Sequence, residues 1–312
     1  MNDSDIPATR ERYRGRFAPS PTGPLHIGSL IAALGSYVEA KRRGGDWLVR
    51  IEDVDHPRVV PGAADEILRT LDGCGMHWDG HVVRQSTHAD AYHAALHELR
   101  QHGLVYPCAC SRREIADSGV AGIEGPVYAG ICRRGLPPGK KARALRIDAA
   151  GARVSFDDAL QGRIAQNLEA DIGDFVLYRA DRIFAYQLAV VVDDAEQGVT
   201  DIVRGADLLD STPRQIYLQD LLALPRPRYL HLPVAVNARG EKLSKQTGAT
   251  PVEGPRLSAA LVAALHFLGQ NPADGLERAQ PKSVLQWALA HWRVEHVPRA
   301  RHCPAPALDS PA

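Results

Sequence analysis

The sequence predicts an α/β protein built on a parallel β-sheet, and three observations support this class. A short buried strand ends near Ala18, a helix follows from about residue 26, and a second strand covers residues 47–51. A strand, a helix and another strand in this order are typical of the start of a parallel sheet. The 312 residues suffice for one large domain or two ordinary ones, and 45% hydrophobic and 24% charged residues are typical of a soluble globular protein.

Charge and cysteine content limit the possible partners. Lys plus Arg and Asp plus Glu both number 37, so a nucleic-acid surface would have to be a local patch. No apolar run approaches the roughly 20 residues of a membrane span, and the polar N-terminus lacks the apolar core of a signal peptide. We therefore expect a cytoplasmic protein without a membrane partner. Three of the five cysteines lie between 108 and 132, which favours metal ligands over disulfides.

The first element and its connection lie in residues 16–30, which hold three prolines and two glycines. The prolines forbid a helix until about Leu25, after which the residues are apolar and compatible with a helix. The start of a helix offers free N–H groups and a positive dipole end, which suit a phosphate. Gly28 would let a ligand approach the backbone, and His26 adds a side-chain donor.

The next elements continue the sheet. The first helix should extend to Arg43, where two glycines stop it, and the second strand ends in Glu52-Asp53. Ligands of parallel sheets sit at the carboxyl ends of strands, where Ser20 and Glu52 both fall. Further expected helices cover 63–74, 87–102, 212–222, 257–268 and 282–292. Returning strands are expected at 174–181, 185–192, 202–205 and 228–236.

Two later segments also suggest chemistry. Cys108, Cys110 and Cys132 suit tetrahedral Zn²⁺, with free buried cysteines as the alternative and His102 as a chemically possible fourth ligand. The run Lys242-Leu243-Ser244-Lys245 lies in a glycine-flanked loop where two lysines can clamp polyphosphate. As an isolated run it would be typical of an ordinary surface loop.

Taken together, these motifs resemble class I aminoacyl-tRNA synthetases of the glutamyl and glutaminyl branch. The run Arg-Phe-Ala-Pro-Ser-Pro-Thr-Gly and the following His-Ile-Gly-Ser resemble their first signature, and Lys-Leu-Ser-Lys resembles their second. Arg-Ile-Glu-Asp-Val-Asp at 50–55 is similar to another run of this branch. The resemblance covers about residues 15–295 and implies a Rossmann-like catalytic domain that uses ATP, with Mg²⁺, to activate an amino acid.

The resemblance also implies roles for individual residues. The residues implied in catalysis are His26, Ser29, Lys242 and Lys245, and those implied in binding ATP are His26, Gly28, Ser29 and Lys245. The residues implied in binding glutamate are Arg16, Phe17, Ala18, Pro19, Ser20, Glu52, Tyr186 and Arg204. In these roles Glu52 holds the α-ammonium group and Arg204 faces the substrate carboxylates. Without the resemblance, Glu52 could be a solvated turn residue and Tyr186 a core aromatic.

The cysteine pattern is similar to that of short paralogues in the glutamyl branch, which implies Tyr128 as the fourth zinc ligand. These paralogues attach glutamate to the queuosine base in the anticodon of tRNA(Asp). About 65 residues follow the second signature, which leaves no room for the usual anticodon-binding domain. The alternatives are a truncated conventional glutamyl-tRNA synthetase and a non-catalytic RNA-binding or protein-binding relic.

The predicted organisation follows from the resemblance, and we expect a monomer. The expected parts are a loose extension at 1–15, a first catalytic half at 16–105, a zinc-binding insertion at 106–172, a second catalytic half at 173–254, C-terminal helices at 255–296 and a loose tail at 297–312.

Overall fold

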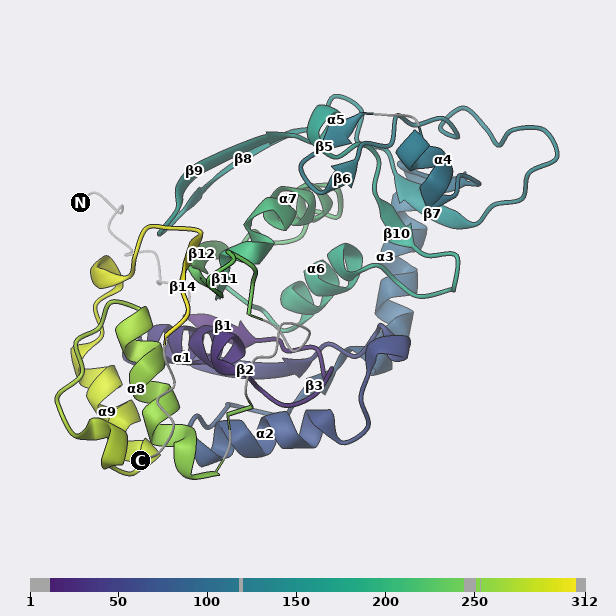
Figure 1. Ribbon diagram of the computed structural model, residues 1–312. Coiled ribbons are helices and arrows are strands. Elements are labelled where there is room, and N and C mark those ends of the chain that lie inside the picture. The colour runs from purple at the N-terminus through teal and green to yellow at the C-terminus, as the bar shows by residue number, and fades with distance from the viewer. Residues whose placement is uncertain (1–11, 118–119, 244–250, 253, 307–312) are drawn as a thin grey trace, which may run out of the picture.

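The fold contains two main groups of strands (Figure 1). The computed structural model describes residues 12–117, 120–243, 251–252 and 254–306. The first group is a three-stranded sheet in the order of its labels, made of β1 (Arg14–Phe17), β2 (Asp46–Ile51) and β3 (Val83–Arg84). Its strands are all parallel, so the predicted strand–helix–strand beginning is confirmed.

The second group has the strand order β11-β12-β8-β9. Its members are β11 (Asp201–Gly205), β12 (Arg228–Leu232), β8 (Arg153–Asp158) and β9 (Gly162–Asn167). The first three are parallel to one another, and β9 pairs antiparallel with β8. Residues 153–167 of the expected insertion are therefore hydrogen-bonded to the sheet of the second catalytic half.

The two groups meet where β1 begins. The Thr200 N–H group donates to the Arg14 carbonyl at 2.9 Å, and the Arg14 N–H group donates to Thr200 Oγ1 at 2.9 Å. Thr200 directly precedes β11, so β1 and β11 start side by side, and residues at the ends of both strands line the same cleft. The carboxyl ends of β1, β2, β11 and β12 therefore share one edge, which is where parallel sheets place ligands.

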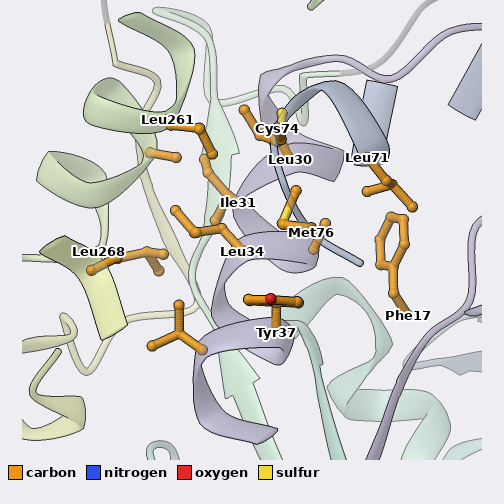
Figure 2. Close-up of a cluster of buried hydrophobic side chains, with 14 of the residues drawn as sticks. Phe17, Leu30, Ile31, Leu34, Tyr37, Leu71, Cys74, Met76, Leu261 and Leu268 are labelled. Carbon is orange, nitrogen blue, oxygen red and sulfur yellow. The ribbon is translucent and has the colours of Figure 1, made fainter. Parts of the chain in front are cut away.

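Helix α1 (Ile27–Arg42) is the central element of the largest core cluster. Leu30, Ile31 and Leu34 are at most 2% exposed and point toward α8 (Leu257–Phe267), as Figure 2 shows with Leu261. Gly44, just beyond the helix, has a φ of +64°, which explains why a glycine stops the helix here. The predicted end at Arg43 is confirmed within one residue.

Four further helices match the expected ranges closely, namely α2 (Ala63–Gly73), α3 (Ala89–Gln101), α7 (Thr212–Leu221) and α9 (Pro281–His291). Two short helices, α4 (Arg112–Asp117) and α5 (Leu168–Asp171), were not expected. Ser211 precedes α7 and Pro213 lies in its first turn, as expected from the sequence. None of the described helices is long and apolar enough to cross a membrane.

The expected strand at 185–192 is wrong, because this segment begins helix α6 (Tyr186–Glu196). All residues from Leu188 to Asp194 are buried, so the helix has no polar face that could reveal its period. The expected strand at 174–181 forms as β10 (Val176–Tyr178), but it pairs antiparallel with β7 (Ala144–Ile147) outside the parallel sheet. In turn β7 pairs with β4 (Val105–Cys108), and a small hairpin, β5 (Ala121–Gly122) with β6 (Gly125–Pro126), lies nearby in sequence.

The strand expected at 228–236 is interrupted at Pro233, which separates β12 from β13 (Val234–Val236). Strand β14 (His302–Pro304) pairs in parallel with β13, and the Val234 N–H group donates to the Arg301 carbonyl at 2.9 Å. The expectation of a loose tail from 297 is therefore wrong for residues 302–304. These residues are ordered because their backbone groups pair with β13. The composition of the tail alone does not indicate this pairing.

Candidate active site

A cleft of about 920 Å³ opens at the shared carboxyl edge of the strands. Its lining includes the predicted ATP and glutamate residues that the structure describes, namely Arg16, Phe17, Ala18, Pro19, Ser20, His26, Gly28, Ser29, Glu52, Tyr186, Arg204 and Lys242. These residues come from segments up to about 225 residues apart in sequence. Lys245 lies outside the described residues.

The first signature forms a turn that is fixed to the neighbouring strand. The Glu52 N–H group donates to the Pro19 carbonyl at 3.0 Å, which joins the turn after β1 to the end of β2. His26 caps α1: its Nδ1 accepts from the Ser29 N–H group at 3.4 Å, and its Nε2 lies 3.2 Å from Ser29 Oγ. A Cβ atom at Gly28 would lie 3.1 Å from the His26 ring, so glycine allows the imidazole to sit over the helix start.

The described flanks of the second signature reach the same cleft. The Leu243 N–H group donates to the Ala235 carbonyl at 2.9 Å, and the Val252 N–H group donates to the Leu25 carbonyl at 2.9 Å. Lys242 forms an ion pair with Asp207, and its side chain remains 52% exposed. The chain thus approaches residues 244–250 from the cleft and returns from them beside the first signature.

A buried network of charges lies under the turn after β1. Arg16 donates to both carboxylate oxygens of Asp194, at 3.1 and 3.3 Å, and Arg50 Nη2 lies 2.8 Å from the same carboxylate. Burial would raise the pKa of Asp194, but the two guanidinium groups outweigh it and hold that pKa below its usual range. One edge of Arg16 is therefore already committed to Asp194.

Glu52 belongs to this network, but its contact with Arg50 is longer than the contact between Arg50 and Asp194. Its Oε1 lies 3.3 Å from Arg50 Nη2. Burial raises the pKa of Glu52, and Arg50 and Arg16 lower it only in part, so the net shift is upward. A further cation beside Glu52 would stabilise its ionised form. The site is thus electrostatically suited to an ammonium group.

Arg204 is buried at the end of β11 and has one unpaired edge. Its Nε donates to His231 Nε2 at 3.0 Å, and its Nη2 donates to Thr212 Oγ1 at 2.8 Å and to Gln215 Oε1 at 2.7 Å. Its Nη1 is buried and has no hydrogen-bond partner among the residues that the structure describes. A buried guanidinium nitrogen without a partner is costly, and Arg204 lines the cleft. The arrangement is suited to a carboxylate ligand.

Tyr186 completes this end of the cleft. It is the first residue of α6, directly after Ala185 in extended conformation. Burial raises the pKa of Tyr186, and the nearby Glu52 carboxylate adds to the effect. The phenol therefore keeps its proton at neutral pH and can donate a hydrogen bond to a ligand.

A second candidate site lies away from the cleft, around three cysteines. The sulfurs of Cys108, Cys110 and Cys132 lie within 4.8 Å of one another, and those of Cys110 and Cys132 are 3.7 Å apart. The hydroxyl of Tyr128 lies 3.4 and 3.6 Å from the sulfurs of Cys108 and Cys110. Zn–S bonds of about 2.3 Å and Zn–O bonds of about 2.1 Å in a tetrahedron place two sulfurs about 3.8 Å apart and a sulfur and an oxygen about 3.6 Å apart. The four side chains therefore fit a zinc ion. Among the described residues, the group around these cysteines that could hold a metal ion does not include His102.

Arg146 lies against this cluster. Its Nε donates to the sulfur of Cys108 at 3.4 Å, and its guanidinium lies 4.2 Å from the centre of the Tyr128 ring. A cation at this place would offset the negative charge of cysteine thiolates around a metal. The cluster thus has both a ligand set and a charge-balancing neighbour.

Comparison with known proteins assigns the family. Residues 12–277 match the family described as tRNA synthetases class I (E and Q), catalytic domain. The chain is 60% identical over 289 residues to the Glutamyl-Q tRNA(Asp) synthetase of Dechloromonas aromatica (strain RCB), covering 92% of this chain and 96% of that protein. This chain belongs to the glutamyl-Q tRNA(Asp) synthetase family. The predicted class I synthetase fold and family are thereby confirmed.

Two further comparisons agree with membership in the glutamyl-Q tRNA(Asp) synthetase family. The chain is 56% identical to the Glutamyl-Q tRNA(Asp) synthetase of Aromatoleum aromaticum, covering 96% of this chain and 94% of that protein. The crystal structure of the glutamate-tRNA synthetase from Elizabethkingia anophelis matches with a TM-score of 0.74 and 25% identity, covering 93% of this chain and 67% of that chain. The chain is thus a ligase of the class I synthetase type.

Sequence reasoning missed several residues of this synthetase site. Asp194 follows the segment 185–192, which was expected to be a strand, but it lies inside α6 and pairs with Arg16. His231, which holds Arg204, and Asp207, which pairs with Lys242, were not expected to contribute. The available signal was chemical: a buried arginine requires hydrogen-bond partners, so polar residues within apolar runs were candidates.

Proposed function

We propose that this protein activates L-glutamate with ATP and transfers the glutamate to the queuosine base in the anticodon of tRNA(Asp). The names of its relatives support the acceptor, and the two signature segments that border one cleft support ATP. The observation that carries the choice of glutamate is the buried, unpaired Nη1 of Arg204 at the cleft. An acidic side chain supplies the acceptor that this nitrogen lacks, whereas the glutamine side chain supplies no charge.

The proposed glutamate site uses the charged network under the cleft. Arg204 binds the side-chain carboxylate, and Tyr186 donates a hydrogen bond beside it. Glu52 binds the α-ammonium group of the substrate. The positive charge of this group offsets the cost of burying the Glu52 carboxylate. Arg16, fixed by Asp194, adds positive charge near the substrate, and residues 17–20 form the wall of this end.

The proposed ATP site uses the other end of the cleft. The start of α1 with Gly28, His26 and Ser29 meets the phosphates, and Lys242 also lines the cleft. Lys245 is the second lysine that we assign to the phosphates. An oxygen of the glutamate α-carboxylate attacks the α-phosphorus of ATP; the new P–O bond forms as the bond to pyrophosphate breaks, and pyrophosphate takes the electron pair. Positioned donors and cations stabilise the charge that develops on the phosphate oxygens. Mg²⁺ enters as part of the ATP substrate.

The second step transfers glutamate to the base. A hydroxyl of the vicinal diol of queuosine attacks the carbonyl carbon of glutamyl adenylate and loses its proton, and AMP leaves. An ester forms on the modified base. A single-stranded anticodon loop can splay out this base to reach the cleft.

The acceptor decides between this function and that of a conventional glutamyl-tRNA synthetase. We expect labelled glutamate to be attached to a tRNA(Asp) anticodon stem-loop that carries queuosine, and not to the same loop carrying guanosine. A tRNA(Asp) shortened at its 3′ end should remain a full acceptor. Charging of the 3′ end of tRNA(Glu), without labelling of the queuosine loop, would overturn the proposal.

We further propose that Cys108, Cys110, Cys132 and Tyr128 hold one structural Zn²⁺. The bound ion would cross-link β4 to the loop at 128–132, and it takes no part in the two chemical steps. Elemental analysis should find about one zinc per chain in the native protein. Cys110→Ser should lower the zinc content and the melting temperature, whereas Cys303→Ser, outside the cluster, should change neither. Zinc-free protein of unchanged stability would favour free buried thiols.

A monomer in the cytoplasm is the simplest state for this proposal. A single chain supplies the lining of the cleft, including all the predicted ATP and glutamate residues that the structure describes. The proposal therefore needs no partner subunit. Light scattering should give a mass near 33.9 kDa, and cell fractionation should recover the protein with cytoplasmic markers.

A further inference from the structure

Arg204 is held by two buried residues to which the proposed function gives no role. His231 lies opposite Arg204 in the register of β11 and β12, and its Nε2 is 3.0 Å from Arg204 Nε. Its Nδ1 is 2.6 Å from Asp158 Oδ2 on β8. Neither His231 nor Asp158 is among the residues that line the cleft. Three neighbouring strands thus carry a chain of Arg, His and Asp side chains.

The hydrogen bonds determine which imidazole nitrogen carries the proton. A guanidinium group only donates, so His231 Nε2 accepts from Arg204 and carries no hydrogen. His231 Nδ1 therefore carries the hydrogen and donates it to Asp158. Burial lowers the pKa of His231 to about 4, and the charge of Arg204 adds to this against the opposing hydrogen bond to Asp158. The ring is neutral in the neutral pH range.

Asp158 is fixed in turn by backbone donors. Its Oδ1 accepts from the N–H groups of Leu160 at 3.0 Å, Gln161 at 2.9 Å and His231 at 3.2 Å. Burial would raise the pKa of Asp158, but the hydrogen bonds from His231 and these amides hold it below its usual range. The result is an ionised carboxylate that balances the charge of Arg204 without touching it.

We propose that His231 and Asp158 are positioning residues for substrate recognition, which fix the guanidinium plane of Arg204 and leave its Nη1 edge open to the substrate carboxylate. Arg16 differs from Arg204, because a carboxylate, that of Asp194, accepts hydrogen bonds from Arg16 directly and occupies two of its donors. None of the ion pairs in the described part of the chain involves Arg204. The inference rests on the proposed role of Arg204 and adds two residues that do not contact substrate.

Two substitutions of His231 separate positioning from packing. In His231→Asn the amide can still donate to Asp158 but does not reach Arg204, whereas in His231→Gln the longer side chain can place its carbonyl oxygen near the former Nε2. Loss of a hydrogen bond to a charged group predicts a rise in the KM for glutamate of about 10- to 100-fold in His231→Asn. We expect His231→Gln to retain a KM within several-fold of the native value, and both variants to keep the native KM for ATP.

Asp158→Asn tests the chain from its other end. Three N–H donors face the Oδ1 position, so the amide oxygen must occupy it and the NH₂ group must face His231 Nδ1. The imidazole proton would then move to Nε2 and oppose the Arg204 Nε–H group. We expect a rise in the KM for glutamate as large as in His231→Asn, together with a change of tautomer in the ¹⁵N NMR spectrum of His231. Unchanged kinetics in Asp158→Asn would overturn the proposal.

Tyr229→Phe is the matched control, because it keeps the buried ring whose centre lies 5.7 Å from the Arg204 guanidinium and removes only the hydroxyl, which bonds to Gln219. We expect this variant to lose stability without a change in the KM for glutamate. An equal rise of the KM for glutamate in Tyr229→Phe, His231→Asn and His231→Gln would indicate packing and overturn the proposal. The ¹⁵N NMR spectrum of the native protein is a further test that needs no variant. A His231 ring protonated at Nε2 would also overturn the proposal.

The proposal and the function on which it rests can fail separately. If Arg204→Gln leaves the KM for glutamate unchanged, the role of Arg204 itself is wrong. If Arg204→Gln raises this KM but His231→Asn does not, only the positioning by His231 and Asp158 is wrong.

Discussion

The two ends of the cleft are built differently. At the glutamate end, the Arg16 side chain is 3% exposed and fixed by a buried carboxylate, and Arg204 is held by three side chains. At the phosphate end, the Lys242 side chain is 52% exposed and His26 bonds within its own helix turn. Ordering before binding reduces the entropy lost when a ligand binds. The comparison indicates that the end proposed to bind glutamate is preorganised by buried contacts, whereas the end proposed to bind phosphate carries a more exposed cation.

The largest effect should follow from changing the preorganised end. Arg204→Gln leaves a buried substrate carboxylate without its charged partner, and breaking a buried ion pair costs about 3–5 kcal/mol. We expect kcat/KM for glutamate in pyrophosphate exchange to fall about 10³-fold, and the preference for glutamate over glutamine to disappear. Steady-state kinetics with both amino acids measure this.

Arg226→Gln is the control for this prediction. Arg226 pairs with Asp220 on the surface, where ion pairs contribute little, so both kinetic constants should remain native. A retained preference for glutamate in folded Arg204→Gln would show that the amino-acid end does not select by charge.

A smaller effect should follow at the phosphate end. His26→Ala removes a donor at the start of α1, and loss of one preorganised donor reduces kcat by about 10²-fold or more. The KM for glutamate should stay close to native, because His26 does not contact the charged network. A variant that loses glutamate affinity instead would contradict the division of the cleft into two ends.

The local parts of this site could be predicted from the sequence, and the long-range parts could not. Prolines, glycines and the apolar run around His26 predict the turn and α1 because their effects on the backbone are local. By contrast, Arg16 and Asp194 are 178 residues apart, and His231 and Asp158 are 73 apart. No periodicity links such pairs. The order of the strands brings His231 to Asp158, and the placement of α6 brings Asp194 to Arg16.

Helix α6 shows a second limit of sequence reasoning. Because the segment Leu188–Asp194 is buried on all sides, neither a period of two nor one of 3.6 residues is visible. The error concealed the contribution of Asp194, which pairs with Arg16 from within α6. The three cysteines were predictable because their spacing is itself the signal.

The pH dependence sharpens the comparison further. Burial raises the pKa of Glu52 above its usual range, and in its proposed role Glu52 must be ionised to bind the α-ammonium group. As pH falls, protonation of Glu52 should therefore raise the KM for glutamate, and the rise should begin at a higher pH than an ordinary glutamate side chain would give. Glu52→Gln should have a high KM that lacks this rise. An equally steep pH dependence in Glu52→Gln would assign the titration to another group.

The smallest effect concerns α7, which carries Thr212 and Gln215. Ala223, just beyond this helix, has a φ of +49°, where a residue with a Cβ atom is strained by about 1 kcal/mol. Ala223→Gly relieves this strain, and the greater freedom of glycine in the unfolded chain offsets about half of it. We expect a gain of about 0.5 kcal/mol, or a melting temperature higher by about 1–2 °C.

The control for Ala223→Gly is the same substitution within a helix. Ala94→Gly, on the exposed side of α3, should lower the stability by about 1 kcal/mol, so the two variants should shift the melting temperature in opposite directions. Neither should change the kinetics of glutamate activation, because Arg204 is already ordered in the native protein. A change in the KM for glutamate in Ala223→Gly would mean that α7 is not yet fixed before binding, and that the glutamate end resembles the phosphate end more than its buried contacts indicate.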